Sequence, residues 1–130
     1  MIALDTNVLV RIVVDDDPTQ ARKARAMLAR EQGFVSVTVL LESEWVLRGA
    51  YELAPAAILT VFERLLRVRG IDVEDRARVE RAVAWYADGL DFADALHLAG
   101  APTASSFATF DRKLARRAAR LTGAPPITHP

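Results

Sequence analysis

Short apolar runs alternate with longer amphipathic segments along this chain of 130 residues. The apolar runs are bounded by glycine, proline or polar residues, as buried strands are, and they lie at residues 1–4, 34–37, 71–73, 107–110 and 127–128. Helical spacing of apolar positions is found at residues 8–14, 18–31, 38–53, 55–68, 74–88, after Asp91, and at 112–121. This alternation predicts an α/β fold in which helices cover both faces of a parallel sheet.

Local signals indicate where several helices begin and end. Asp17, Pro18 and Gln20 combine an N-cap, a proline at the first helical position and a capping-box glutamine. Gly33, Gly70 and Gly89 are expected to end helices. The acidic loop formed by Asp15, Asp16 and Asp17 is better explained by capping and solvation than by metal binding.

The composition restricts the fold and the chemistry. A chain of this length, 52% hydrophobic, fits one domain over residues 1–130. The formal net charge is zero, so nucleic acid would have to bind a local patch. Cysteine is absent and only His97 and His129 are present, which excludes thiolate sites and disfavours zinc. No apolar run reaches membrane-spanning length and no signal peptide is apparent, so a cytoplasmic protein is expected.

Two acids follow apolar strands. Asp5 comes directly after the first run, and Asp111 comes after the run at residues 107–110. In parallel α/β sheets, functional groups gather at the carboxyl ends of the strands. Each acid could instead act only as the N-cap of the helix that follows it.

Two further positions are expected to lie on helices. In the helix of residues 38–53, Glu42 and Glu44 fall at opposite edges of one apolar arc, so periodicity does not choose between them. Asp94 follows Asp91 by three residues, which fits a capping box at the start of a helix. The small neighbours of Asp94, Ala93 and Ala95, would also allow tight packing around a functional acid.

If the fold is parallel α/β, Asp5, Asp94, Asp111 and an acid of the helix at residues 38–53 project toward the same edge of the sheet. Such a cluster offers only oxygen ligands, which suit Mg²⁺ or Mn²⁺. Because Mg²⁺ keeps open coordination positions, the cluster would also accept a phosphate.

Four short motifs in this order resemble a PIN domain, and most closely the VapC-type toxins of bacterial toxin–antitoxin pairs. The motifs are IALDTN at residues 2–7, VLLE at 39–42 followed by WVL at 45–47, DFADAL at 91–96 and TFD at 109–111. The resemblance covers essentially the whole chain. It implies a PIN-like α/β/α sandwich with a central parallel sheet.

The resemblance also implies a divalent-metal-dependent endoribonuclease with Asp5, Glu42, Asp94 and Asp111 as ligands and catalytic acids. It selects Glu42 over Glu44, because the family's acid stands three residues before the tryptophan. One or two Mg²⁺ or Mn²⁺ ions would generate a hydroxide nucleophile and stabilise charge on the phosphate. Polar residues matching the lining of the family's pocket would orient metal-bound waters, and these are Thr6, Asn7 and Thr109. A packed or surface role is favoured for His97.

The predicted partners are RNA, a cognate antitoxin and a second copy of the chain, the last two being implied by the resemblance. For RNA, the expected surface is basic, because the segment from residue 95 onward contains five cations and only one acid, Asp111. The cations are Arg112, Lys113, Arg116, Arg117 and Arg120. For the antitoxin, the expected surface is the apolar face around Trp45, Leu47 and Tyr51.

Two other classes of protein are alternatives to a nuclease. A phosphoacceptor receiver domain would need a lysine after the fifth strand, and the only lysines are Lys23 and Lys113. A PIN-fold module that binds RNA or protein without cleaving would be expected to lack some of the four acids.

Overall fold

The computed structural model describes residues 1–14 and 16–130. Asp15, part of the predicted acidic loop, therefore lies outside the described residues. The chain forms two compact units, Met1–Arg76 and Ala77–Pro130.

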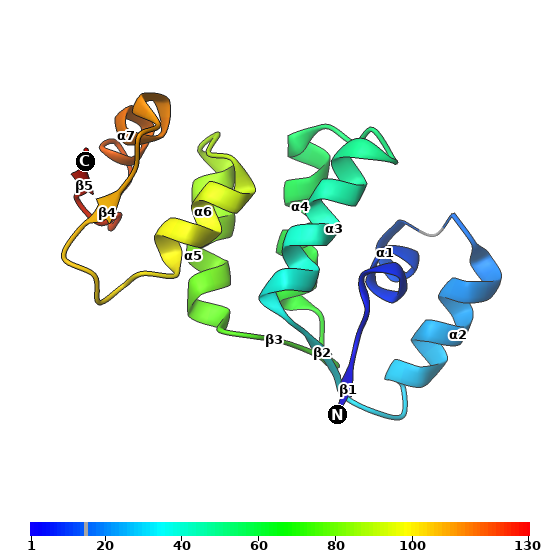
Figure 1. Cartoon of the computed structure of the whole chain (residues 1–130). Helices are drawn as coiled ribbons and strands as arrows, with labels where there is room; N and C mark the ends of the chain where they lie inside the picture. The colour runs from blue at the N-terminus through cyan, green and yellow to red at the C-terminus, as the bar shows by residue number, and fades with distance from the viewer. Residues whose placement is uncertain (15) are drawn as a thin grey trace. The chain divides into compact units, whose positions relative to one another are not determined.

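Unit 1 contains a three-stranded parallel sheet in the order β1-β2-β3 (Figure 1). Its strands are β1 (Ile2–Ala3), β2 (Gly33–Val35) and β3 (Ile71–Val73). Ile2 pairs with Gly33, and Gly33 pairs with Ile71. The Leu4 N–H extends the ladder by donating to the Phe34 carbonyl at 2.8 Å. Because β1 and β2 are parallel neighbours, the segments carrying Asp5 and Ser36 both leave the sheet at its carboxyl edge.

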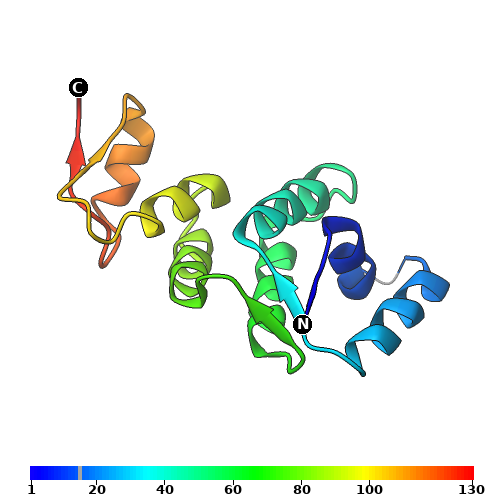
Figure 2. The same ribbon diagram turned by 60° about the horizontal axis from the view of Figure 1, so that its bottom comes forward.

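Two helices of unit 1 begin at side-chain caps, and the cap at Asp17 is the one predicted from the sequence. Asp17 caps α2 (Pro18–Leu28) by accepting from the Gln20 N–H at 3.1 Å, and Ser36 caps α3 (Val37–Gly49) through the Val39 N–H at 3.3 Å. The other two are α1 (Thr6–Val14) and α4 (Pro55–Arg67). Helix α1 packs against α2 and α3, and α3 packs against α4 (Figure 2). Fully buried side chains from three of these helices, Leu9, Leu40 and Phe62, form the core.

Unit 2 joins helices to a two-stranded parallel sheet, in which β4 (Phe107–Ala108) pairs with β5 (Ile127–Thr128). Its helices are α5 (Arg76–Ala87), α6 (Phe92–Ala99) and α7 (Arg112–Ala118). Tyr86 and Phe92 pack edge to face with ring centroids 5.3 Å apart. The Arg78 Nε donates to the Leu96 carbonyl at 3.0 Å, which ties α5 to α6. Gly89 adopts φ of 96° in the turn between these helices, a conformation that glycine accepts without strain.

The predicted elements are all present, and the differences lie at their ends. Helix α2 stops at Leu28, so Gly33 belongs to β2 and does not end the helix. Helix α3 stops at Gly49, short of residue 53, and Glu52 adopts φ of 53° in the turn that follows. Strand β4 ends at Ala108, and Phe110, expected at the end of this apolar strand, is 82% exposed. None of the helices in the described ranges has the length and apolar character needed to cross a bilayer.

The prediction that Leu47 lies on the antitoxin surface is wrong. This side chain is fully buried in unit 1, so it is part of the core and cannot contact a partner. The Tyr51 hydroxyl accepts from Arg11 at 2.7 Å and donates to Asp16 at 2.8 Å. Of the three residues expected on that surface, only Trp45 is well exposed, at 67%. Periodicity alone did not distinguish the buried side of α3 from its exposed side, because apolar residues occupy both.

Candidate functional site

The first two candidates lie where β1 ends and α1 begins. The Asp5 carbonyl accepts the first helical hydrogen bond, from the Leu9 N–H at 3.1 Å. Its carboxylate, however, accepts no hydrogen bond from any described group, so capping does not account for it. The neighbouring Thr6 is buried, and its Oγ1 has no hydrogen-bond partner among the described residues. A buried hydroxyl without a partner is costly, and it commonly marks the place of a water or an ion.

Asn7 is exposed on α1. It lines a cavity of about 380 Å³ together with Arg11, Gln20 and Lys23. Val8, Ala24 and Met27 complete the lining, and none of the four predicted ligands is part of it.

The structure distinguishes clearly between the two glutamates of α3. Glu44 is 3% exposed, and its Oε1 accepts from the Arg48 Nε at 3.0 Å, one turn further along the helix. Glu42 is exposed, and nothing in the described part of the chain hydrogen-bonds to its carboxylate. Glu44 thus has a structural partner, whereas Glu42 is free to bind a cation.

Asp94 belongs to a cluster of ionisable side chains in unit 2. Its pKa is raised above the ordinary carboxyl value, first by burial and then by the negative charges of Asp91 and Asp111. His97, on the same helix, acts in the opposite direction and lowers this pKa. The structure thus brings together Asp94 and Asp111, two of the predicted ligands, in an arrangement that disfavours the charged form of Asp94.

Capping explains some of these acids only in part. Asp91 caps α6 by accepting from the Asp94 N–H at 3.2 Å, but the Asp94 carboxylate makes no return hydrogen bond, so the predicted capping box is incomplete. Asp111 caps α7 through the Leu114 N–H at 3.0 Å. The Thr109 Oγ1 accepts from the Asp111 N–H at 3.0 Å, which fixes the backbone immediately before the cap. One Asp111 oxygen is thereby oriented by the helix.

The basic residues near the end of the chain differ in what they contact. Arg117 donates to the Gly89 carbonyl at 2.6 Å and so holds α7 against the turn between α5 and α6. Arg112 and Arg116 line a cavity at α7, and Arg120 is exposed beyond the end of this helix. Arg117 therefore has a structural contact that the charge pattern did not reveal.

The four predicted ligands are divided between the two units. Asp5 and Glu42 lie in unit 1, and Asp94 and Asp111 lie in unit 2. Within residues 1–14 and 16–130, no three acid, histidine or cysteine side chains form a group that could hold a metal ion. Convergence of all four acids therefore stays a prediction.

A family model identifies the class of protein to which this fold belongs. The PIN domain model matches residues 2–120, and the chain belongs to the PIN domain family. The α/β/α class predicted from the sequence is thereby confirmed. PIN domains are generally nucleases, they typically use divalent metals, and membership indicates nucleic-acid binding. Searches of curated proteins and of solved structures gave no significant match.

Proposed function

We propose that this chain is a divalent-metal-dependent endoribonuclease that acts as the toxin of a toxin–antitoxin pair. The observation that carries the proposal is the cluster of Asp94 and Asp111, in which burial and like charge raise the pKa of Asp94. Such a cluster opposes the charged state unless a cation is present. Carboxylates with pKa values shifted by burial and like charge are concentrated in active sites.

The residues present fit a hard divalent ion. Asp5, Glu42, Asp94 and Asp111 offer only oxygen ligands, which Mg²⁺ and Mn²⁺ prefer. The carboxylates of Asp5, Glu42 and Asp94 are not used by other hydrogen bonds in the described chain. The partnerless Thr6 hydroxyl beside Asp5 is a further polar group that a bound water would satisfy.

In the proposed mechanism, Asp5, Glu42, Asp94 and Asp111 would hold the ion, and the bound ion would supply an activated water and stabilise charge on the scissile phosphate. Asp111 is oriented for this role by its bond to the Leu114 N–H. Thr109 positions Asp111 through the preceding backbone. Thr6 and Asn7, adjacent to Asp5, orient waters around the site. No protein nucleophile is required.

RNA is proposed to bind through exposed cations near α7, namely Arg112, Arg116 and Arg120. Counterion release from the phosphates would then supply much of the affinity despite the zero net charge of the chain. The proposed protein partners are a cognate antitoxin and, in a homodimer, a second copy of the chain, with the exposed Trp45 as part of the antitoxin contact.

The decisive experiment is incubation of the purified protein with total cellular RNA, with Mn²⁺ or with EDTA, followed by mapping of new 5′ ends. We expect discrete cuts with Mn²⁺, none with EDTA, and none with Asp94→Asn. The matched control is Glu63→Gln, an exposed acid on α4, which should cut like the wild type. Absence of cleavage with any divalent metal would instead favour a PIN-fold binding module without catalytic activity.

The toxin role has a separate test. The reading frame next to the gene should encode a small, partly disordered protein that co-purifies with this chain and blocks cleavage. If no such partner exists while RNA is cleaved, the nuclease assignment holds and the toxin assignment is wrong.

A further inference from the structure

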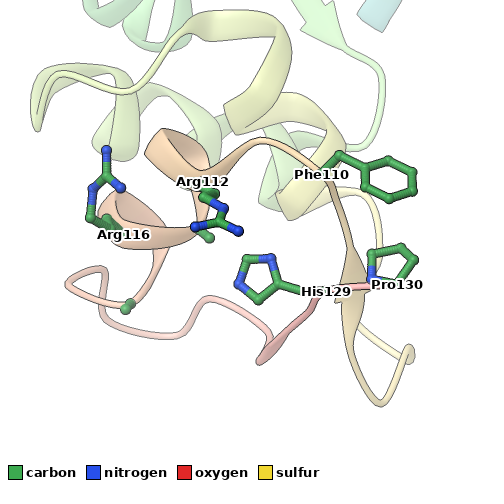
Figure 3. Close-up of a pocket in the computed structure, with 7 residues that line it drawn as sticks. Phe110, Arg112, Arg116, His129 and Pro130 are labelled. Carbon is green, nitrogen blue, oxygen red and sulfur yellow. The ribbon is translucent and has the colours of Figure 1, made fainter.

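A cavity of about 630 Å³ lies beside α7 in unit 2 (Figure 3). Arg112 and Arg116 line it from the helix, Phe110 from the segment before the helix, and His129 and Pro130 from the end of the chain. This volume is in the range that small-molecule ligands occupy, roughly 300–1,000 Å³. The cavity is therefore large enough for one nucleotide of a bound strand.

The ionisable side chains that line this cavity are Arg112, Arg116 and His129. Arg112 and Arg116 are four residues apart on α7, so they project from the same face of the helix. No aspartate or glutamate lines the cavity, and neither guanidinium hydrogen-bonds to or pairs with a side-chain carboxylate in the part of the chain that the structure describes. Free guanidinium groups can bind phosphate oxygens in a bidentate manner. The cavity therefore has the electrostatic character of a phosphate site.

Phe110 gives the same cavity an aromatic wall. The side chain is 82% exposed, more than Met1, Trp45 or Val68, the other large apolar residues on the surface of the described chain. Leaving a phenylalanine in water forgoes the free energy that burial of its ring would contribute. A cavity lined by both an exposed ring and free arginines is suited to stacking a nucleobase while holding the backbone.

We infer that this cavity is a nucleotide subsite for single-stranded RNA, in which a base stacks on Phe110 and the adjoining phosphates bind Arg112 and Arg116. The inference rests on the proposed nuclease function and adds where the substrate strand binds. Phe110 and Arg112 flank Asp111 in the chain, so a strand held here lies next to one of the proposed ligands. A local cationic subsite also explains how a chain of zero net charge retains a polyanion.

Binding without cleavage tests the aromatic contact. The probe is fluorescein-labelled octauridine, measured by fluorescence anisotropy in EDTA. We expect Phe110→Ala to weaken binding about 10-fold, as loss of one stacked base does, and Phe110→Trp to retain wild-type affinity. An abasic octamer of the same charge should bind the wild type and Phe110→Ala equally. Equal binding of octauridine by the wild type and Phe110→Ala would overturn the inference.

The salt dependence of binding tests the two arginines. Arg112→Ala/Arg116→Ala should reduce the slope of log K against log salt by about 1.4, close to 0.7 for each lost phosphate contact. The matched control is Arg22→Ala/Arg67→Ala, which removes the same charge from exposed positions in unit 1. If the control reduces the slope equally, the effect comes from net charge and the subsite is wrong.

Two further comparisons separate this inference from others. If uridine monophosphate competes as well as octauridine at equal nucleotide concentration, the cavity binds free nucleotides and not a strand. Cleavage is measured separately with Mn²⁺. A wild type that cleaves while the cavity variants bind normally would refute the subsite alone. A wild type that never cleaves while the variants lose binding would refute the nuclease function and keep the subsite as an RNA-binding site.

Discussion

Asp94 shows how a single side chain connects stability with function. Its pKa is raised by burial and by Asp91 and Asp111, so the folded state favours its protonated form. In the absence of metal, Asp94 contributes most favourably to the stability of the folded state at a pH below 3.8, the ordinary pKa of its carboxyl group. The contribution is lost as the pH rises through the raised folded-state pKa.

We therefore predict that Asp94→Asn stabilises the protein in EDTA at neutral pH. The Tm should rise by roughly 2–4 °C, since less than 1 kcal/mol is expected for one partly exposed charge. The gain should shrink as the pH is lowered toward 3.8, where the wild-type carboxyl is also protonated. Thermal melts of both proteins between pH 4 and 7 provide the measurement. A difference in Tm that does not vary with pH would show that charge at Asp94 is not the cause.

Substitutions at the two glutamates of α3, Glu42 and Glu44, form a matched pair of variants. Glu42→Gln should abolish cleavage and leave the free energy of unfolding almost unchanged, because Glu42 is exposed and makes no hydrogen bond in the described chain. Glu44→Gln should cost about 1 kcal/mol, because it weakens a buried charge-assisted hydrogen bond to the half-exposed Arg48, and the folded protein should still cleave. Urea unfolding and the RNA assay measure both variants. Loss of cleavage only in Glu44→Gln would reverse the assignment.

Strand β2 and helix α3 differ in the space that each has for a side chain in place of its glycine. A Cβ at Gly33 in β2 would lie 2.7 Å from the Leu28 Cδ2 and 3.4 Å from the Gly70 carbonyl oxygen. A Cβ at Gly49, at the end of α3, would meet no atom within 4 Å. The strand is enclosed by its neighbours, whereas this end of the helix is open.

Gly33→Ala is predicted to destabilise the protein by about 1–3 kcal/mol, because the added methyl would overlap the Leu28 side chain, which must move. Gly49→Ala is predicted to stabilise it by about 0.5–1 kcal/mol, which is the usual gain from replacing a helical glycine. Equilibrium unfolding in urea measures both. If Gly33→Ala were neutral, the packing between α2 and β2 would be looser than the structure shows.

At the scale of the whole molecule, we predict that residues 1–130 behave as one domain in solution, although the chain forms two compact units. Calorimetry in EDTA should give a single transition whose calorimetric and van't Hoff enthalpies agree. Two resolved transitions would show that the units Met1–Arg76 and Ala77–Pro130 unfold independently.

Metal should then stabilise the whole chain. At a Mn²⁺ concentration 100 times Kd, binding adds ~2.7 kcal/mol, or about 10 °C in Tm for a chain of this size. Asp5→Asn in unit 1 and Asp94→Asn in unit 2 should each remove most of this increase. If only one of the two variants loses it, the four acids do not serve one metal site.

Local signals in the sequence predicted most of the elements. Side-chain caps at Asp17, Ser36, Asp91 and Asp111 begin helices by satisfying N–H groups within three residues, so their effect can be read without knowing the rest of the fold. The positions of the strands could also be predicted, because short apolar runs are likewise visible in the local sequence. The choice of Asp5, Glu42, Asp94 and Asp111 came from motif order, and it remains a prediction for the four acids together.

Burial and proximity were decided by tertiary packing. The apolar residues of α3 do not reveal that Leu47 and Glu44 are enclosed while Trp45 and Glu42 are exposed, because enclosure depends on segments distant in the chain. The exposure of Phe110 likewise depends on where β4 ends and how it pairs with β5. The pKa of Asp94 is raised first by burial and then by Asp91 and Asp111, and the burial and the closeness to Asp111 arise from the folding of α6 and α7 in one unit. Local hydrogen bonds are determined by neighbouring residues, whereas solvent exclusion and electrostatic proximity are determined by the whole fold.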